Sequence, residues 1–341
     1  MEPFWRGDVM RDESCLFVQR GDGLPTSRLL LPSRDILAVT DASGETRYTE
    51  GDDWVLGDDE QSLTLPEGSG IPHLAETALY PPLSLQGAIP YRVGGDRWLL
   101  FSEDVFFAEQ QVRVTYQHGG WAGPVPANPG LRRTLDRLED GALTMVLFGD
   151  SISAGANATQ MFGVPPNLPP YGSLVAERLR QAYGAEVAYA NLSVGGMDSA
   201  WGLRQIEAAV KLDPDLVILA WGMNDSSGGR SVEDFVANVR GQMDAVLHAR
   251  PECDIVLVAT MWGNPEWALA RPDLYPVYRD ALAELVAPGV ALADMTTLWG
   301  WMLQRKRFVD VTGNGVNHPN DFGHGMYADT VMAAIVGTHE V

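Results

Sequence analysis

The sequence predicts a parallel α/β domain preceded by an all-β domain, and three observations support this division. Residues 139–341 alternate apolar runs of strand length with longer helical stretches, the pattern of a parallel sheet with helices on both faces. Residues 1–125 instead hold short apolar or alternating runs separated by turn residues. The length of 341 residues exceeds that of one average domain, so two domains are expected.

The first 125 residues are predicted to form an all-β sandwich of the jelly-roll type. Short strands at this spacing, with turns between them, are typical of two packed antiparallel sheets. The candidate strands are Cys15–Val18, Arg28–Leu31, Ile36–Val39, Trp54–Leu56, Trp98–Phe101 and Gln111–Tyr116. The turn signals between them are Gly44, Gly51–Asp53, Gly68–Gly70 and Gly94–Asp96.

Residues 126–138 are expected to connect the two domains. Pro124, Pro126 and Pro129 disfavour regular structure at the start of this stretch. Leu131–Leu138 then has the composition of a helix that leads into the second domain, residues 139–341.

The second domain is predicted to contain five strands. They are expected near 143–148, 187–190, 215–220, 254–259 and 290–293, and the clearest helices at Ser173–Tyr183, Val232–Ala249 and Tyr275–Val286. Ser231 precedes Glu233 and Asp234, so it should cap the second of these helices. The carboxyl ends of parallel strands meet at one edge of the sheet, where α/β proteins bind their ligands.

The most informative segment, Phe148–Gly155, follows the first of these strands. Gly149 allows a sharp bend, so Ser151 should stand between the end of the strand and the start of a helix. A serine held there has an exposed hydroxyl, and neighbouring N–H groups can face a developing oxyanion. Gly-Asp-Ser alone also occurs in ordinary turns, so the motif needs support from elsewhere in the chain.

Three later segments supply that support. They are Asn191–Gly196, Trp221–Asp225 and Asn317–His324, and the first two follow predicted strands. Two adjacent glycines let the backbone approach a ligand closely, and Asn224 can donate its side-chain amide, although asparagine also serves ordinary turns. His318, beside a proline and ahead of the last helical stretch, is a candidate general base.

Serine, glycine, asparagine and histidine in this order resemble the SGNH subgroup of the GDSL-type esterases and lipases, over about residues 140–341. The resemblance implies a three-layer, flavodoxin-like parallel sheet. It also implies that Ser151 is the nucleophile and His318 the base. The oxyanion hole would then consist of the Ser151 N–H, the Gly196 N–H and the Asn224 side chain.

One position departs from the family pattern. The family usually places an Asp three residues before the histidine, and here that residue is Gly315. Three explanations compete: a backbone carbonyl holds the imidazole and leaves a Ser-His dyad, Asn314 or Asp310 reaches it from a reshaped loop, or the enzyme is impaired. We favour a working dyad, since an orienting acid contributes less than nucleophile or base. His324 should serve packing or capping.

A β-sandwich ahead of such a domain is similar to the layout of some carbohydrate esterases that remove acetyl groups. Aromatic and polar side chains near the expected site agree with a sugar substrate, because aromatic faces stack on sugar rings. The candidate substrate contacts are Asp150, Trp201, Trp221, Trp262, Asn264 and Trp267, and packing accounts equally well for each tryptophan taken singly. The proline-rich loop Met161–Pro170 fits a rigid pocket wall better than an apolar lid.

Charge and composition restrict the partners. The net charge of −21 argues against nucleic acids and anionic membranes, and the expected substrate is a small ester or an esterified oligosaccharide. No run of 18 apolar residues exists. The histidines outside the site (His73, His118, His248, His324 and His339) form no metal motif, so no metal or other cofactor is expected. Cys15 and Cys253 are expected to be free thiols. A cytoplasmic location is expected unless a leader was removed.

The leading hypothesis is therefore a metal-independent serine esterase, a carbohydrate O-deacetylase that accepts small acyl groups. A lipase, thioesterase or acyltransferase with the same Ser-His pair is the alternative among enzymes. A catalytically impaired glycan-binding protein is the alternative from another class. The β-sandwich would bind sugar itself, support the catalytic domain, or form a homo-oligomer interface.

Overall fold

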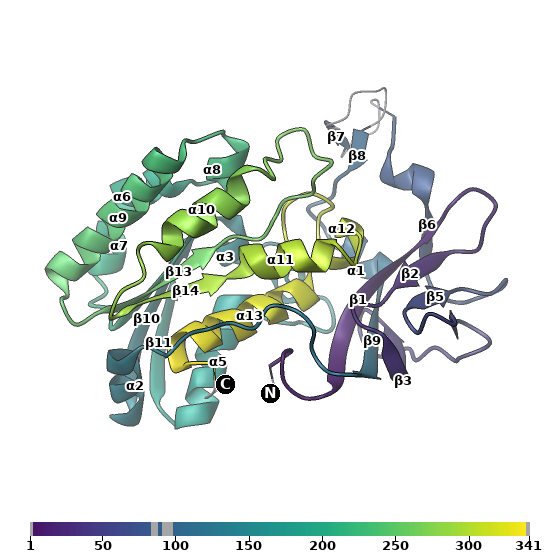
Figure 1. Cartoon of the computed structure of the whole chain (residues 1–341), viewed down its shortest axis with the longest axis horizontal. Coiled ribbons are helices and arrows are strands. Elements are labelled where there is room, and N and C mark those ends of the chain that lie inside the picture. Colours follow the sequence, from purple (N-terminus) through teal and green to yellow (C-terminus); the bar gives the residue numbers. More distant parts are fainter. Residues whose placement is uncertain (1–2, 83–87, 91–97, 339–341) are drawn as a thin grey trace.

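A computed structural model describes residues 3–82, 88–90 and 98–338 of the chain. Two sheets make up its framework (Figure 1). A five-stranded parallel sheet between helices lies beside a predominantly antiparallel sheet built from the first 118 residues. The parallel α/β sheet is thus as the sequence predicts, and the antiparallel strands before it agree in part with the predicted all-β sandwich.

All five predicted strands of the parallel sheet are confirmed. They are β10 (Ala142–Gly149), β11 (Glu186–Asn191), β12 (Leu216–Trp221), β13 (Asp254–Ala259) and β14 (Val290–Asp294). Their order is β11-β10-β12-β13-β14, and every neighbouring pair is parallel. This is the flavodoxin-like order, in which the first strand lies inside the sheet and the chain changes direction beside it.

Helices cover both faces of the parallel sheet because its strands are apolar on both sides. On one face pack α2 (Arg132–Glu139), α5 (Tyr171–Tyr183), α11 (Met295–Leu303) and α13 (Asp321–Val336). On the other pack α6 (Ser199–Gln205), α7 (Glu207–Val210), α9 (Val232–Ala249) and α10 (Leu274–Ala283). Ser231 caps α9 as predicted, since its hydroxyl accepts the Asp234 N–H.

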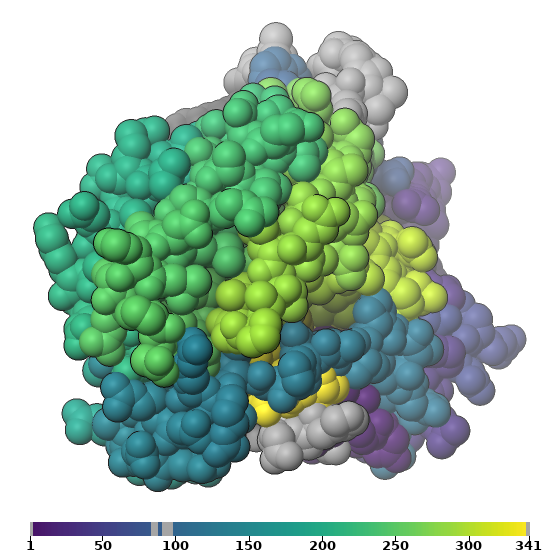
Figure 2. Space-filling model, turned by 60° about the vertical axis from the view of Figure 1, so that its left-hand side comes forward, coloured from purple at the N-terminus to yellow at the C-terminus, as the bar shows by residue number. Residues whose placement is uncertain are grey.

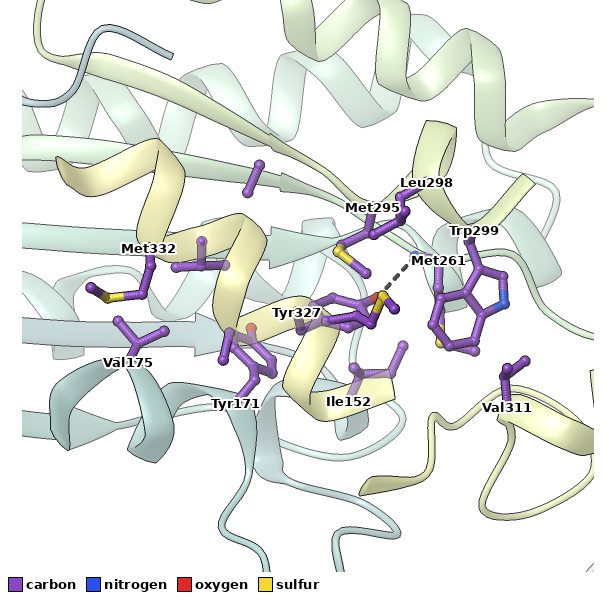
Figure 3. Close-up of a cluster of buried hydrophobic side chains, with 14 of the residues drawn as sticks. Ile152, Tyr171, Val175, Met261, Met295, Leu298, Trp299, Val311, Tyr327 and Met332 are labelled. Carbon is purple, nitrogen blue, oxygen red and sulfur yellow. Dashed lines mark hydrogen bonds between the residues drawn. The ribbon is translucent and has the colours of Figure 1, made fainter. Parts of the chain in front are cut away.

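The core of the first face lies around α13, which is buried along most of its length. Tyr327 stands at its centre, with its ring 5.1 Å from that of Tyr171 on α5 (Figure 3). The Tyr327 hydroxyl accepts the Met261 N–H, which fixes the segment after β13 against α13. This packing holds the start of α13, and the loop before it, at the carboxyl edge of the sheet.

Short helical turns complete the α/β part. They are α3 (Ser151–Ala154), α4 (Thr159–Phe162), α8 (Met223–Ser227) and α12 (Phe308–Val311). The expected linker runs irregularly to α2, and the Leu131 N–H donates to the Ile335 carbonyl at 2.8 Å. In the space-filling view this blue segment lies along the yellow C-terminal helix (Figure 2). The lead-in helix is confirmed.

The β-rich part forms one seven-stranded sheet around the long strand β1 (Val9–Gln19). The other strands are β2 (Thr26–Arg28), β3 (Ser33–Asp41), β4 (Val55–Leu56), β5 (Ser62–Thr64), β6 (His73–Ala75) and β9 (Gln111–His118). The first half of β1 pairs with β9 and its end pairs with β2 and β6. A separate two-stranded antiparallel sheet consists of β7 (Ala88–Pro90) and β8 (Trp98–Leu100).

The predicted strands overlap β1, β2, β3, β4, β8 and β9, whereas β5, β6 and β7 were not predicted. Three further details differ from an all-β sandwich. The β1–β6 pair is parallel, and two helical turns occur, η1 (Glu76–Leu79) and α1 (Phe106–Gln110). The predicted strand Arg28–Leu31 ends at Arg28, because the Leu30 N–H donates to buried Glu13 instead of a neighbouring strand. The predicted turn Gly94–Asp96 and His339 lie outside the described residues.

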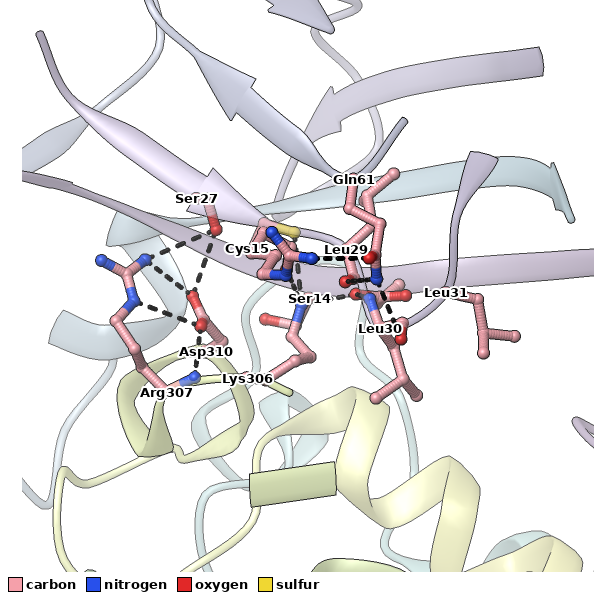
Figure 4. A network of polar contacts seen from close by, with 12 residues as sticks. Ser14, Cys15, Ser27, Leu29, Leu30, Leu31, Gln61, Lys306, Arg307 and Asp310 are labelled. Carbon is pink, nitrogen blue, oxygen red and sulfur yellow. Dashed lines mark hydrogen bonds and ion pairs between the residues drawn. The ribbon is translucent and has the colours of Figure 1, made fainter. Parts of the chain in front are cut away.

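The two parts share one hydrophobic core and one buried polar network. The same apolar cluster contains Phe17 and Val112 of the β-rich sheet and Met326 of α13. Arg307 and Asp310 of the α12 segment pair with each other, and the Asp310 carboxylate accepts the Ser27 hydroxyl of β2 (Figure 4). The β-rich part is therefore bound firmly to the α/β part.

No helix in the described ranges is long and apolar enough to cross a membrane. Cys15 and Cys253 are both free and buried, as predicted. Burial raises the pKa of the Cys15 thiol to about 11 and that of Cys253 to about 12, so both thiols stay protonated at neutral pH.

Candidate active site

Ser151 is held at the carboxyl end of β10 by the local chemistry of the Gly-Asp-Ser motif. A Cβ at Gly149 would lie 2.5 Å from the Ala220 carbonyl oxygen, so only glycine fits where β10 passes β12. Asp150 caps α3 by accepting the Ile152 N–H at 3.0 Å. Ser151 is thereby the first residue of α3, partly exposed, as the sequence predicts.

His318 lies against Ser151, with 2.9 Å between its Nε2 and the serine Oγ. Its loop is shaped by the Asn314 side chain, whose Oδ1 accepts the backbone N–H groups of Val316, Asn317 and His318. The loop therefore presents the histidine rigidly, with 6 % of the residue exposed. The structure brings the predicted nucleophile and base into hydrogen-bond contact.

Two residues that the sequence analysis missed contact the other ring nitrogen. Asn157 Oδ1 lies 2.8 Å from His318 Nδ1, and Glu103 Oε2 lies 3.4 Å from the same atom. Asn157 Nδ2 donates to the Gly313 carbonyl, which fixes Oδ1 as the atom that faces the ring. Since Oδ1 can only accept, Nδ1 carries the proton and Nε2 is free to accept the Ser151 hydroxyl proton.

In the described structure, the His318 ring is held by none of the groups that the sequence analysis proposed for this role, which were a backbone carbonyl, Asn314 and Asp310. Asn314 acts on the main chain of the loop, and its Nδ2 donates to Asn317 and Glu103. The Asp310 carboxylate points to the β-rich sheet, where it accepts the Leu16 N–H at 2.9 Å and pairs with Arg307. The expectation that Asp310 reaches His318 is wrong, because its charge is used at the junction of the two parts.

The predicted oxyanion donors lie on the two neighbouring loops. Gly196 has φ +77°, and a Cβ added to the preceding Gly195 would lie 3.7 Å from the Ser151 Cβ. The Asn191 side chain donates to the Ser153 carbonyl at 2.7 Å and so ties this loop to α3. Asn224 Nδ2 donates to the Met197 carbonyl at 2.8 Å, which leaves its second N–H available.

Three of the predicted substrate contacts are used inside the protein. Trp221 is 2 % exposed and donates its Nε1–H to Gln242. Asp150, 2 % exposed, is the α3 cap described above. Asn264 is 4 % exposed and donates to the Gly315 carbonyl, so it braces the histidine loop. The burial of these side chains contradicts the predicted substrate contacts.

The remaining tryptophans are partly buried. The Trp201 ring packs on Phe148 at 5.6 Å between centroids, and Trp262 donates its Nε1–H to the Thr296 carbonyl. Trp267 is half-buried on the loop after β13, and its backbone N–H donates to the Asn264 carbonyl. Trp201, Trp262 and Trp267 thus all stay candidates for substrate contact.

Burial shapes the electrostatics beneath the site. It raises the pKa of the Asp150 carboxyl to about 7 and lowers the pKa of His324 to about 4. His324 is fully buried, and its Nε2 lies 3.1 Å from the Ala156 carbonyl oxygen, which agrees with a packing role. The described residues contain no cluster of three or more metal-binding side chains.

The comparisons with known proteins identify the family of this chain. Residues 147–326 match the model of the GDSL-like Lipase/Acylhydrolase family, and the chain belongs to this family. It is accordingly an acylhydrolase of the GDSL type. No curated protein matches it.

Solved structures of similar fold align with little more than half of this chain. A lipase from a goat rumen metagenome is 15% identical, with a TM-score of 0.47, and the match covers 57% of this chain and 98% of that one. An acetylxylan esterase from Geobacillus stearothermophilus is 18% identical, with a TM-score of 0.45 and coverages of 56% and 93%. A family 3 carbohydrate esterase from Talaromyces cellulolyticus is 16% identical, with a TM-score of 0.44 and coverages of 56% and 94%.

Proposed function

We propose that this chain is a metal-independent serine esterase that removes short acyl groups, above all acetyl, from carbohydrates. The observation that carries the proposal is the 2.9 Å contact between Ser151 Oγ and His318 Nε2 at the carboxyl edge of a GDSL-family sheet. The Asn157 contact sets the ring tautomer in which Nε2 can accept a proton. Nucleophile and base are thus prepared for acyl transfer.

The mechanism follows from these positions. His318 Nε2 takes the Ser151 hydroxyl proton while Oγ attacks the ester carbonyl carbon. The Ser151 and Gly196 N–H groups and the free N–H of Asn224 donate to the resulting oxyanion. The protonated His318 gives its proton to the leaving alcohol, which completes the acyl-enzyme. Water, deprotonated by the same nitrogen, then releases the acid.

The distribution of apolar surface supports a short acyl group. Among the described segments at the carboxyl edge of the parallel sheet, the exposed large apolar side chains are Val194, Met161 and Leu269, one on each of three separate segments. A long acyl chain needs a continuous apolar surface. The Met161–Pro170 loop is fastened to the start of α4, since the Leu168 N–H donates to the Thr159 hydroxyl, which fits a fixed wall.

The carbohydrate part of the proposal rests on a few features near the site. Trp267 offers a half-buried aromatic face on the loop after β13. That loop also contacts the β-rich part, since the Tyr80 hydroxyl donates to Glu266 and the Ala268 N–H donates to the Pro90 carbonyl. The net charge of −21 favours neutral over polyanionic substrates.

The first test is hydrolysis of p-nitrophenyl acetate, butyrate and octanoate by the wild type, Ser151→Ala and His318→Ala. We expect the acetate to be preferred, EDTA to leave the rate unchanged, and both variants to lose activity by about a thousandfold or more. Asp244→Ala, a substitution on the exposed surface of α9, is the control. Preference for octanoate would favour a lipase, and wild-type turnover equal to that of folded Ser151→Ala would refute the esterase proposal.

The substrate class needs a second measurement. Acetate release from acetylated xylan or acetylated monosaccharides should depend on Ser151 and should fall when Trp267 is changed to Ala, mainly through a higher KM. Release from p-nitrophenyl acetate should be nearly unchanged in the same variant. An equal loss on both substrates would remove the sugar-stacking role from Trp267.

A further inference from the structure

We propose that Glu103, a residue of the β-rich part, is the acidic positioning residue of His318, so that the catalytic group is assembled from both parts of the chain. This inference rests on the proposed function, because it assigns a role within the same site. It places the acid 215 residues before the histidine, whereas the family usually has it three residues before. Asn157 is its neutral partner at the same ring nitrogen.

Geometry brings the Glu103 carboxylate to the back of the imidazole. Its Oε2 lies 3.4 Å from His318 Nδ1, and its Oε1 accepts the Asn314 Nδ2 hydrogen at 3.3 Å. The adjacent Ser102 N–H donates to the Asn314 carbonyl at 3.2 Å. The segment that carries Glu103 is therefore attached to the histidine loop by its main chain as well as its side chain.

The usual acid position is closed by the same segment. Gly315 has φ +85°, and a Cβ there would lie 2.4 Å from the Leu100 carbonyl oxygen and 2.7 Å from the Phe107 ring. No side chain fits at that distance from a backbone oxygen. The β-rich part thus occupies the place of the usual aspartate and supplies a carboxylate of its own a few residues further on.

Asn157 and Glu103 serve the ring at different stages. In the resting site the Nδ1–H donates to Asn157, the nearer acceptor, and this sets the tautomer. When His318 takes the Ser151 proton it becomes positively charged, and an amide oxygen offers only a dipole to that charge. The Glu103 carboxylate offers a full negative charge, which stabilises the imidazolium and the transition state that resembles it.

The surrounding charges leave this role to Glu103. His324 also lies close to His318, and burial lowers its pKa to about 4, so it is neutral at working pH. The contact with the His318 ring lowers the pKa of Glu103, so its carboxyl is ionised there. Because 53% of the Glu103 side chain is exposed, solvent weakens the interaction, and the effect should be smaller than for a buried triad acid.

The decisive variant is Glu103→Gln, which keeps the shape and removes the charge. We expect kcat on p-nitrophenyl acetate to fall about 10- to 100-fold with KM little changed. The acidic limb of the pH–rate profile should move to lower pH by about one unit, because the imidazolium loses a stabilising charge. Glu103→Asp should retain more activity than Glu103→Gln. Glu109→Gln, on the exposed surface of α1, is the matched control and should behave like the wild type.

A second measurement does not depend on any ester substrate. The His318 ring signals, followed by NMR against pH in the Ser151→Ala background, should change at lower pH in Glu103→Gln than in Glu109→Gln. An unchanged ring titration together with wild-type kcat would overturn the role of Glu103. If the wild type hydrolysed no ester but the titration still moved, the proposed function would fail while the pairing stood.

Discussion

At the scale of single residues, the two neighbouring glycines of the predicted oxyanion loop differ in backbone conformation. Gly196 has φ +77° with open space around a would-be Cβ, whereas Gly195 has no positive φ and would make only an ordinary contact. Gly196→Ala should therefore strain the backbone and lower kcat about tenfold or more, and Gly195→Ala should be milder. Steady-state kinetics of the two variants checks this, and equal losses would contradict it.

Asn224 is the side-chain donor of the same hole. Removing such a donor costs about 100- to 1000-fold in kcat. Asn224→Ala should show a loss in this range with a smaller change in KM, measured on p-nitrophenyl acetate. Because its other N–H holds the Met197 carbonyl, part of the loss would come from loop disorder. Asn224→Asp keeps the shape but loses both N–H donors, so its kcat should fall at least as far, and a kcat near that of the wild type would contradict the role of Asn224.

His324 makes stability depend on pH. Its pKa is lowered from 6.5 to about 4 by burial, so between these values the unfolded chain binds a proton that the folded protein does not. The stabilisation is complete above about pH 6.5 and is lost as pH falls toward 4. Compared with His324→Gln, the wild type should lose about 2 kcal/mol more in free energy of unfolding between pH 7 and 5.

Urea unfolding of both proteins at the two pH values measures this difference. The Asp150 carboxyl, whose pKa burial raises to about 7, has the opposite dependence, but it is present in both proteins and cancels in the comparison. Parallel pH profiles for the wild type and His324→Gln would show that His324 is protonated in the folded state and would refute the prediction.

The sequence could predict Ser151 and His318 but not the groups behind the histidine. The first two sit in short motifs at strand ends, where local order suffices to place them. Asn157 lies in a loop without a motif, and its φ of 63° is visible only in the structure. Glu103 reaches the site through the packing of two separate parts. The prediction that Trp221 and Asn264 contact substrate was wrong for a different reason. A motif places a residue near a site but does not say which way its side chain points.

At the scale of elements, the histidine loop is built so that its glycine cannot be replaced. Restoring the family's usual residue, by Gly315→Asp, should not raise activity, because the new Cβ would press on the Leu100 carbonyl. We expect Gly315→Ala and Gly315→Asp to lower the free energy of unfolding by about 2 kcal/mol or more. Gly325→Ala, in α13 with open space around its Cβ, is the control and should be neutral or stabilising.

Measuring the activity of Gly315→Asp distinguishes two outcomes. Gly315→Asp could fold with wild-type stability and a higher kcat only if the Leu100 segment moved away from position 315. That result would show that the close packing described above is wrong. Loss of both stability and activity in the variant, with Gly325→Ala unaffected, agrees with a loop fixed by the β-rich part.

Helices and strands whose own sequence carries a clear pattern could be predicted. The five parallel strands and α9 carry continuous apolar runs or a cap such as Ser231, so their bounds agree with the structure to within a few residues. Strands β5 and β6 were missed because three residues carry too little pattern. Their pairing depends on β1 and β2, which is a matter of long-range contact.

At the scale of the whole molecule, a buried ion pair binds the two parts. Lys306, before α12, pairs with Glu13 of β1, and both side chains are inaccessible to solvent. Lys306 also donates to the Arg28 carbonyl, and Glu13 accepts the Tyr116 hydroxyl hydrogen. Tyr116 and Cys15, which contact this pair, belong to the apolar core that the two parts share. The β-rich part should therefore unfold together with the α/β part.

Lys306→Met tests whether the two parts unfold together. The variant leaves the Glu13 charge buried with neutral partners, and breaking such a pair costs about 3–5 kcal/mol. We expect a loss of about that size in a single cooperative transition, with tryptophan fluorescence and far-UV circular dichroism coinciding. Arg20→Met breaks an exposed pair with Glu76 and should cost less than about 1 kcal/mol. Two separate transitions, with the esterase activity surviving the first, would show that the α/β part stands alone, and the histidine would then not need an acid from the β-rich part.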